Sequence, residues 1–405
     1  MGLLLAASGL GFFATAGAAE IGFAAARTRA LTSAPDVTLA ERRAELSQVD
    51  VRIAAQRPNP GASFTTARRT AKLGTSVSVP LQVFGQRGTA VDASRAEARA
   101  VTLDITATKR EVLWSATTAW IDLWETQQRA KLLGLSSEDS QRLLHIAQEK
   151  LDAGAGARID QVRARADRVR AEAEAGAARR AIDAAAARLA VWLGAAPEAP
   201  LLATGDPGYR VEAVPLDTLL RALVDHPALR RDRAQIEAAI ARIRNEKRQR
   251  WPLVNAQVTF NNNDPTLPGD DVIVGLGLEL PVFSNREGNI ARARAEQTLA
   301  TAATQSDLQR LGSGLLDAYR RTEGERLQFL ALREKALPAI SEARAMTSEG
   351  YAMGRIDLLR VLEAQKALLD TRLAVAGANA SWARAVADLE RAAGVDLGPG
   401  GLDAH

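Results

Sequence analysis

Along each half of the chain, hydrophobic residues first recur with the spacing of a helix, then at every second residue as in a β-strand, and then with the helical spacing again. Between Gly88 and Gly154, and again between Gly288 and Gly354, the chain is rich in Ala, Leu, Arg, Glu and Gln. These residues lose little free energy on entering a helix, so each stretch predicts a helix of roughly 100 Å. Helices of that length need partners along their whole surface, which favours long antiparallel hairpins over one globular core.

Two shorter segments have a period of two. Residues 75–83 place valine and leucine on one face and serine and glutamine on the other, and residues 271–280 again alternate apolar residues with small or polar ones. Such alternation is typical of half-exposed β-strands. The pattern predicts one hairpin of strands of about ten residues in each half, at about 62–84 and about 253–283.

Three pairs of glycines lie two hundred residues apart: Gly88 and Gly288, Gly154 and Gly354, Gly194 and Gly394. This spacing indicates that one helical hairpin occurs twice as an internal repeat. Shorter helices are expected before the strands, at about 35–57 and about 227–250. We therefore divide the chain into a first repeat at residues 35–194, with its tip at about 152–160, and a linker at 195–225. A second repeat follows at 226–394, with its tip at about 350–358, and then a C-terminal tail at 395–405.

The strands fit a membrane better than a soluble core. On a soluble core the four strands would need a covering layer, and the helices are too long to supply it. In a bilayer, tilted strands of about ten residues span the hydrocarbon, with the apolar face toward lipid. Four strands cannot close a barrel, and open edges in lipid leave backbone groups unpaired. Closure therefore predicts further copies, and three copies would supply twelve strands.

The N-terminus and the composition indicate the cellular compartment in which the protein is expected. Residues 1–19 are apolar and then small, which predicts a secretory signal, with a membrane anchor as the alternative, followed by an N-terminal extension at 20–34. No later segment predicts a membrane-spanning helix. The chain has no cysteine, which excludes disulfides and thiolate metal sites. Its 52 basic and 48 acidic residues are interleaved, a pattern of solvated helices and not of a nucleic-acid partner.

Both tips and one strand-to-helix junction carry recognisable motifs. The segment Tyr351 to Ala364 looks like a Y-x-x-G motif, a spacer and V-L-D/E-A, and residues 152–160 match the corresponding turn of a first repeat. With these motifs the chain resembles the TolC family of outer-membrane efflux proteins over essentially all of its mature sequence. Residues 280–290, LPVFSNREGNI, are similar to the L-P-L-F-N-R-N-Q-G-N-I stretch of the cobalt-zinc-cadmium (CzcC-like) branch.

The resemblance implies a mainly α fold with a small membrane β part, in which long antiparallel hairpins form an α-barrel. It further implies a homotrimer with a twelve-stranded β-barrel in the outer membrane, a long periplasmic portion that closes at the helix tips, a periplasmic adaptor (membrane fusion) protein and an inner-membrane RND pump as partners. The same resemblance gives candidate roles to residues of the tips. Gate or constriction candidates are Asp160, Tyr351, Asp357, Arg360 and Glu363, and adaptor-contact candidates are Gly154, Gly156, Arg158, Gly354 and Arg355.

Within this set, Asp160 and Tyr351 match positions where the family holds the closed tip by a polar link, and Glu363 matches an acidic ring. Arg360 departs from the family, which has a second acid there; it either pairs with Asp160 or Asp357 and locks the tip, or makes the entrance less cation-selective. Each of these charges is also compatible with an ordinary solvated helix surface. The glycines are needed for the turns in any case.

No spacing of histidines or acids resembles a metal site, and no nucleophile or phosphate-binding motif occurs, so we expect no enzyme, no cofactor and no bound metal. The predicted function is the exit duct of a tripartite RND-type efflux system, passive and most consistent with heavy-metal cations. The alternatives are a duct for drug efflux or type I secretion, and a non-conducting periplasmic coiled-coil adaptor or scaffold, which sustained heptads would favour.

Overall fold

The computed structural model describes residues 19–66, 73–154, 156–209, 214–262, 269–281, 283 and 285–397. Most of these residues are helical, with a small β part, as the sequence predicts. The chain divides into two units. We call residues 38–109 and 222–313 the sheet unit, and residues 1–37, 110–221 and 314–405 the tip unit. Residues 1–18 of the expected signal and residues 398–405 of the expected tail lie outside the described residues, and Ala19 is the first residue of a strand.

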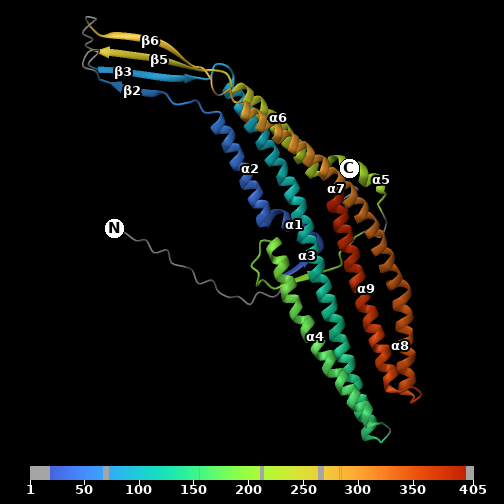
Figure 1. The fold of residues 1–405 in the computed structure, drawn as a ribbon. Helices are drawn as coiled ribbons and strands as arrows, with labels where there is room; N and C mark the ends of the chain where they lie inside the picture. Colours follow the sequence, from blue (N-terminus) through green and yellow to red (C-terminus); the bar gives the residue numbers. More distant parts are fainter. Residues whose placement is uncertain are drawn as a thin grey trace, which may run out of the picture. The chain divides into compact units, whose positions relative to one another are not determined.

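The strands of the sheet unit form one antiparallel sheet in the order β2-β3-β5-β6 (Figure 1). Their bounds are Gly61–Thr65 for β2, Leu73–Leu81 for β3, Leu253–Asn262 for β5 and Asp271–Glu279 for β6. The two hairpins are joined through β3 and β5, where Val77 lies opposite Val258. Val258 in turn lies opposite Val274 of β6, so apolar positions of adjacent strands are in register.

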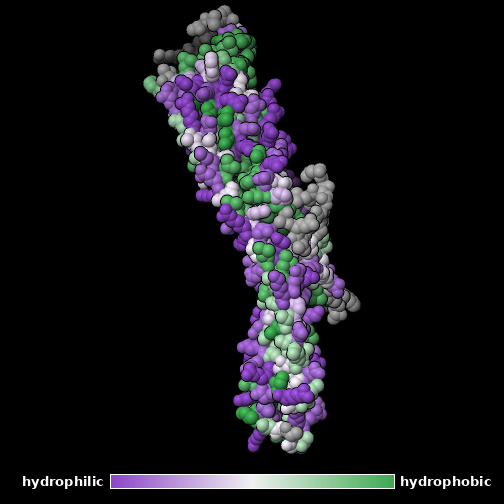
Figure 2. All heavy atoms as spheres, turned by 90° about the vertical axis from the view of Figure 1, so that its right-hand side faces the viewer, coloured by the Kyte–Doolittle hydropathy of each residue, from purple (hydrophilic) through white to green (hydrophobic). Residues whose placement is uncertain are grey.

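One face of this sheet is almost entirely apolar, because successive side chains of a strand point to opposite faces. It carries Val77, Val79, Leu81, Val254, Val258, Phe260, Val272, Val274, Leu276 and Leu278. Val274 and Leu276 are 77% and 75% exposed, and hydrophobic residues gather over this end of the unit in Figure 2. The opposite face carries mostly serine, asparagine, glutamine, threonine and glycine, with Asp271 and Glu279 at the ends of β6 and Pro80, Leu253 and Ile273 as apolar exceptions. The sheet is therefore amphipathic and its apolar face is uncovered in the single chain.

Ion pairs give the order of the helices in the sheet unit. They are α2 (Pro35–Ala54), α3 (Gln86–Asp152), α6 (Pro227–Arg248) and α7 (Glu287–Ala331), of which α3 and α7 extend into the tip unit. Lys109 of α3 pairs with Glu41 of α2 at 3.5 Å, and Arg242 of α6 contacts both Glu97 of α3 and Glu296 of α7 at 3.2 and 2.8 Å. The helices thus form a single layer in the order α2–α3–α6–α7.

A matching layer is found in the tip unit. Its further helices are α1 (Phe23–Ser33), α4 (Arg158–Trp192), α8 (Leu337–Ala352) and α9 (Leu358–Ala393). Ser140 of α3 donates to Asp167 of α4 at 2.8 Å, Trp114 of α3 donates to Asp388 of α9 at 2.7 Å, and Thr322 of α7 donates to the Ala385 carbonyl of α9 at 3.0 Å. At these levels the order is therefore α4–α3–α9–α7, and α8 continues α7 and also contacts α3 toward the tips, where Arg344 lies 4.0 Å from Asp139.

One predicted helix is interrupted. Residues 288–354 are predicted to form a single regular helix, whereas the structure has α7, then a π-helical turn η2 (Leu332–Ala336), then α8. The reason is Pro338, which lies at the start of α8, has no N–H to donate and clashes with the preceding turn of a regular helix. The prediction of one regular helix was wrong here because it overlooked this proline. The corresponding helix of the first hairpin, α3, is continuous.

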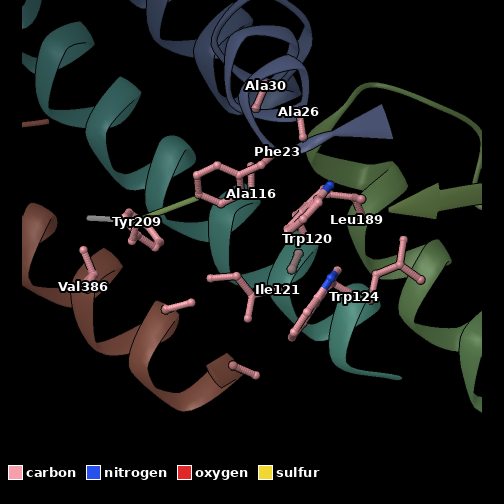
Figure 3. Packing of buried hydrophobic residues seen from close by; sticks show 14 of the residues in the cluster. Phe23, Ala26, Ala30, Ala116, Trp120, Ile121, Trp124, Leu189, Tyr209 and Val386 are labelled. Atoms are coloured by element: carbon pink, nitrogen blue, oxygen red, sulfur yellow. The ribbon is translucent and has the colours of Figure 1, made fainter. Parts of the chain in front are cut away.

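The linker and the N-terminal extension are more ordered than the sequence suggests. β1 (Ala19–Gly22) pairs in parallel with β4 (Leu201–Thr204), and α5 (Leu216–Ala222) and the 3₁₀ turn η1 (Leu223–Asp225) follow. Trp120 and Trp124 of α3 donate to the carbonyls of Ile21 and Gly205, both at 2.9 Å. Phe23 lies between Trp120 and Tyr209, edge to face with each (Figure 3). We call the buried cluster around Phe23, Trp120, Ile121, Leu189 and Tyr209 the belt core.

Within the residues that the structure covers, none of the helices is both long enough and apolar enough to cross a bilayer.

Candidate functional site: the helix tips

Each hairpin of the tip unit ends in a short turn around a glycine in the left-handed conformation. α3 ends at Asp152 and α4 begins at Arg158, while α8 ends at Ala352 and α9 begins at Leu358. Gly154 and Gly354 have φ angles of 71° and 70°, a region that L-residues enter only at a cost. These two glycines are therefore required by the turn itself, because a helix commonly ends with such a residue.

In each turn the residue after the turn lies close to the end of the preceding helix, and a glycine makes room for it. The glycine is the later residue in the first turn and the earlier one in the second. In the first, a Cβ on Gly156 would lie 2.9 Å from the backbone nitrogen of Leu151 and 3.0 Å from the carbonyl carbon of Lys150. In the second, Ile356 holds the position two hundred residues later and the small partner is Gly350, where a Cβ would lie 2.5 Å from Cδ1 of Ile356. A larger residue would thus clash mainly with backbone at position 156 and with the Ile356 side chain at position 350.

The second turn is also capped by a side chain and the first is not. The carboxylate of Asp357 accepts from the backbone N–H of Arg360 at 3.1 Å and so caps α9. At the start of α4 the cap residue is Ala157, which has no side chain that can accept. Asp357, a gate candidate by resemblance, therefore has a structural role as an N-cap, which typically stabilises a helix by about 1 kcal/mol.

A small apolar cluster joins the two hairpins near the turns. We call it the tip cluster: Leu143 and Ala147 of α3, Ala164 of α4, and Leu358 and Val361 of α9. Tyr351, in the last turn of α8, is half-buried against it. Burial and then the nearby negative charge of Asp160 raise the pKa of the Tyr351 phenol. The charge of Asp160 therefore reaches the Tyr351 phenol, and these are the two residues to which the resemblance gives a polar link.

Lys150 is a contact of Tyr351 that the sequence analysis missed. Its Nζ donates to the Tyr351 carbonyl at 3.0 Å and lies 3.7 Å from the centre of the Tyr351 ring. One lysine in the last turn of α3 thus contacts both backbone and ring of the other hairpin. No sequence signal marks it, because Lys150 is one of many charges on a long helix and its partner is 201 residues away.

Arg360 pairs with a residue other than those considered from the sequence. Its guanidinium lies 3.4 Å from the carboxylate of Glu363, one turn further along α9, and both side chains are largely exposed. Neither expected side-chain pairing, with Asp160 or with Asp357, is present among the described residues, although the Arg360 backbone bonds to Asp357. An exposed pair of this kind contributes little to stability, typically below about 1 kcal/mol. It does, however, place a positive charge beside the carboxylate of the expected acidic ring.

The adaptor-contact candidates lie at the surface. Gly154, Arg158, Gly354 and Arg355 are exposed and Gly156 is half-buried. Large apolar side chains share this surface, with Ile159 and Met353 exposed by 54% and 56%. Exposed apolar residues rimmed by charge are typical of protein contact surfaces.

The possible metal ligands of the described residues are scattered and not clustered. No group of three or more His, Cys, Asp or Glu side chains is placed to hold a metal ion among these residues. The sheet unit has a groove of about 700 Å³ between α2, α3, α6 and α7. The charges of Arg242, Glu97 and Glu296 in its lining are already paired with one another.

With this geometry in place, comparison with known proteins gives a consistent result. Residues 219–395 match the family model described as outer membrane efflux protein. The chain is 21% identical over 345 residues to the cobalt-zinc-cadmium resistance protein CzcC of Cupriavidus metallidurans, covering 83% of this chain and 81% of that one.

Solved structures share the fold. Those of CusC, which concern transmembrane channel formation, match with a TM-score of 0.76 at 16% identity and cover 92% of both chains. The outer membrane protein VceC of Vibrio cholerae matches with a TM-score of 0.72 at 18% identity, covering 92% of this chain and 96% of that one. These findings agree with the motifs: the second half of the chain, residues 219–395, matches the outer membrane efflux protein family, and most of the chain is similar to outer-membrane efflux proteins in sequence and fold.

Proposed function

We propose that three copies of this chain form the exit duct of a tripartite RND-type efflux system. The observation that carries the proposal is the sheet of β2, β3, β5 and β6, which has one uncovered apolar face and one polar face. Its longer strands have nine or ten residues, the length that crosses the hydrocarbon core when tilted. In this reading the apolar face contacts lipid and the polar face lines water.

The edges of the chain support closure by further copies. β2 and β6 are the edge strands of the sheet, and unpaired strand edges are not tolerated in lipid. Leu39, Leu46 and Ile53 lie seven residues apart on the edge helix α2 and are at least half exposed. The opposite edge helix, α7, exposes Leu299 by 70%. Apolar residues at a seven-residue spacing are typical of a helix–helix seam, so these edges suit a neighbouring copy. Three copies give a barrel of twelve strands.

We further propose that the chain contains an internal repeat and that its helices lie in the periplasm. The order helix, two strands, long helix, tip and returning helix occurs twice. The tip helices begin and end two hundred residues apart, at Asp152 and Ala352 and at Arg158 and Leu358. The exposed residues at the tips would meet the periplasmic adaptor, which would connect the duct to an inner-membrane pump. Asp160, Tyr351, Arg360 and Glu363 would form the gate, with Asp357 as a cap beside it.

For the exported substrate we propose heavy-metal cations, with selection made by the pump and adaptor. The similarity to CzcC, named for cobalt, zinc and cadmium resistance, supports this substrate. A duct for drugs or secreted polypeptides would have the same wall and differ in its partners. A non-conducting periplasmic scaffold is disfavoured by the uncovered apolar sheet face, which such a scaffold would not need.

The lipid-facing assignment can be tested with a matched pair of variants. Val274 lies in the middle of β6 on the apolar face, and Ser76 lies at a neighbouring level of β3 on the polar face. Val274→Arg should reduce insertion into lipid vesicles, because arginine on the lipid face costs about 2–4 kcal/mol at the middle of a bilayer. Ser76→Arg should insert like the wild type. Equal insertion of both variants, measured by vesicle flotation, would refute the assignment.

A further inference from the structure

We propose that Lys150, together with the tip cluster, holds the two hairpin tips of each chain together when the duct is closed. The inference rests on the proposed function, because it assigns a role in a gate. It concerns a residue that neither the motifs nor the resemblance singles out. Its mechanism is a direct contact between α3 of the first hairpin and the last turn of α8 in the second.

The Lys150 ammonium makes three favourable interactions with a single residue and its helix end. It donates a hydrogen bond of 3.0 Å to the Tyr351 carbonyl. It also lies 3.7 Å from the centre of the Tyr351 ring, well within the range of a cation–π contact. Because Tyr351 belongs to the last turn of α8, the positive charge lies where the helix dipole is negative. All three interactions are lost together if the tips separate.

The surrounding residues leave room for this contact. Gly156 approaches the stem of Lys150 so closely that a Cβ there would lie 3.1 Å from the Lys150 Cβ. The absence of a side chain at Gly156 therefore keeps the lysine stem in its path across to Tyr351. The second tip has no equivalent lysine, since Gly350 lies two hundred residues after Lys150. The contact is thus made once per chain, from the first hairpin to the second.

The contact is also separable from the electrostatic effect of Asp160 on Tyr351. Lys150 meets the ring and the carbonyl of Tyr351, whereas Asp160 acts on the phenol. Tyr351→Phe keeps the ring and the carbonyl, so it should preserve both contacts of Lys150. Tyr351→Leu removes the ring and with it the cation–π contact of Lys150, and leaves the hydrogen bond to the carbonyl. The two effects can therefore be distinguished by substitution.

The test is the open probability of the reconstituted wild-type channel and of its variants in planar bilayers. Lys150→Met keeps the length of the side chain but removes the charge and the donor, and it should raise the open probability about tenfold, the effect of losing about 1.4 kcal/mol. Lys150→Arg should behave like the wild type because a guanidinium also binds over a tyrosine ring. In the Tyr351→Phe background Lys150→Met should retain its effect, and in the Tyr351→Leu background the effect should shrink. An unchanged open probability in Lys150→Met would overturn the proposal.

A second readout does not depend on conduction. The chain has no cysteine, so Asp152→Cys and Met353→Cys give two specific sites for spin labels, one on each tip. In trimers diluted with unlabelled chains, Lys150→Met should broaden the distance between the labels and Lys150→Arg should not. If the wild type fails to conduct, the proposed function fails, while the label distances still decide the role of Lys150. An unchanged distance distribution in Lys150→Met counts against the proposal.

Discussion

The belt core and the tip cluster occur on the same helices of the tip unit, and they are held together in different ways. In the belt core, large rings are almost fully enclosed, with Trp120 at 0% and Phe23 at 6% exposure. The tip cluster consists of only five buried residues, two of them alanines. Polar and charged groups around it are mostly at the surface. The difference teaches that one part of the hairpins is fixed by packing, while the other is held by a few contacts that can be broken singly.

The charges of the two regions differ in the same way. At the belt core, Arg27 is buried and pairs with Glu390 at 2.8 Å and with Asp396 at 2.7 Å. Glu390 also accepts from the backbone N–H of Leu397 at 2.7 Å. At the tips, the pair of Arg360 and Glu363 is exposed. A buried pair is costly to break on one side, whereas an exposed pair is not.

The comparison predicts its largest effect for Trp120→Ala. Truncation of this enclosed ring removes the contact with Phe23 and the hydrogen bond to Ile21, and should cost about 4 kcal/mol. Thermal unfolding of the detergent-solubilised protein, followed by circular dichroism, should shift to markedly lower temperature. The matched variant Leu358→Ala, in the tip cluster, should instead leave that transition nearly in place and increase hydrogen exchange at the tips. Equal shifts of the unfolding transition in both variants would remove the distinction between the regions.

A somewhat smaller effect is expected for Arg27→Met. Removal of one partner leaves the Glu390 carboxyl buried without its cation, at a cost of about 3 kcal/mol. The same thermal unfolding measurement applies, and the control is Arg360→Met at the tip, which should change the transition little.

The variant also has a predicted pH dependence. Burial, supported by Asp396 and opposed by Arg27, raises the pKa of Glu390. A carboxyl whose pKa is higher in the folded than in the unfolded protein stabilises the fold at low pH, and this stability is lost as pH rises through the folded value. Without Arg27 the pKa of Glu390 should rise further, so the loss of stability as pH rises above the ordinary carboxyl value should be larger than in the wild type. Adding Glu390→Gln should abolish the difference, and a pH profile parallel to that of the wild type would contradict the role of the buried pair.

The smallest effect concerns the backbone of the tips. Gly156→Ala would press a Cβ against the backbone at Lys150 and Leu151, and should weaken the first tip by about 2 kcal/mol. Gly134→Ala, at a helical position in α3 with open space around it, should instead stabilise the helix by about 0.5–1 kcal/mol. Hydrogen exchange of residues near 150–160 measures the difference. Faster exchange in Gly134→Ala than in Gly156→Ala would contradict the packing seen at the first tip.

The sequence predicts the parts of the fold that depend on local pattern. Helix-forming residues, alternation at residues 75–83 and turn glycines such as Gly154 each act within a few residues of themselves, so the helices, strands and tips could be located in advance. The pairing of β3 with β5 and the parallel pair of β1 and β4 join distant segments, and no local pattern indicates such partners. The π-helical turn was missed because Pro338 was overlooked within a strongly helical stretch.

The candidate site was predicted to a similar extent. Asp160 and Tyr351 could be named by resemblance, and the charge of Asp160 acts on the Tyr351 phenol, while the pairing of Arg360 with Glu363 depends on side-chain conformation along α9. The contact of Lys150 with Tyr351 and the buried pair of Arg27 with Glu390 were not predicted, because each joins a charged residue to a partner hundreds of positions away and charge is abundant in this chain. Such contacts are set by the three-dimensional packing and not by local sequence.

The most direct test of the duct is to determine the mass of the detergent-extracted protein and to record its conductance in planar bilayers, for the wild type and for Glu363→Ala. We expect trimers with a small, cation-selective conductance. Glu363→Ala should lower the cation selectivity, because it removes a carboxylate and leaves Arg360 without its partner. A protein that remains monomeric or dimeric and never inserts into the bilayer would contradict the trimeric duct and favour a periplasmic scaffold.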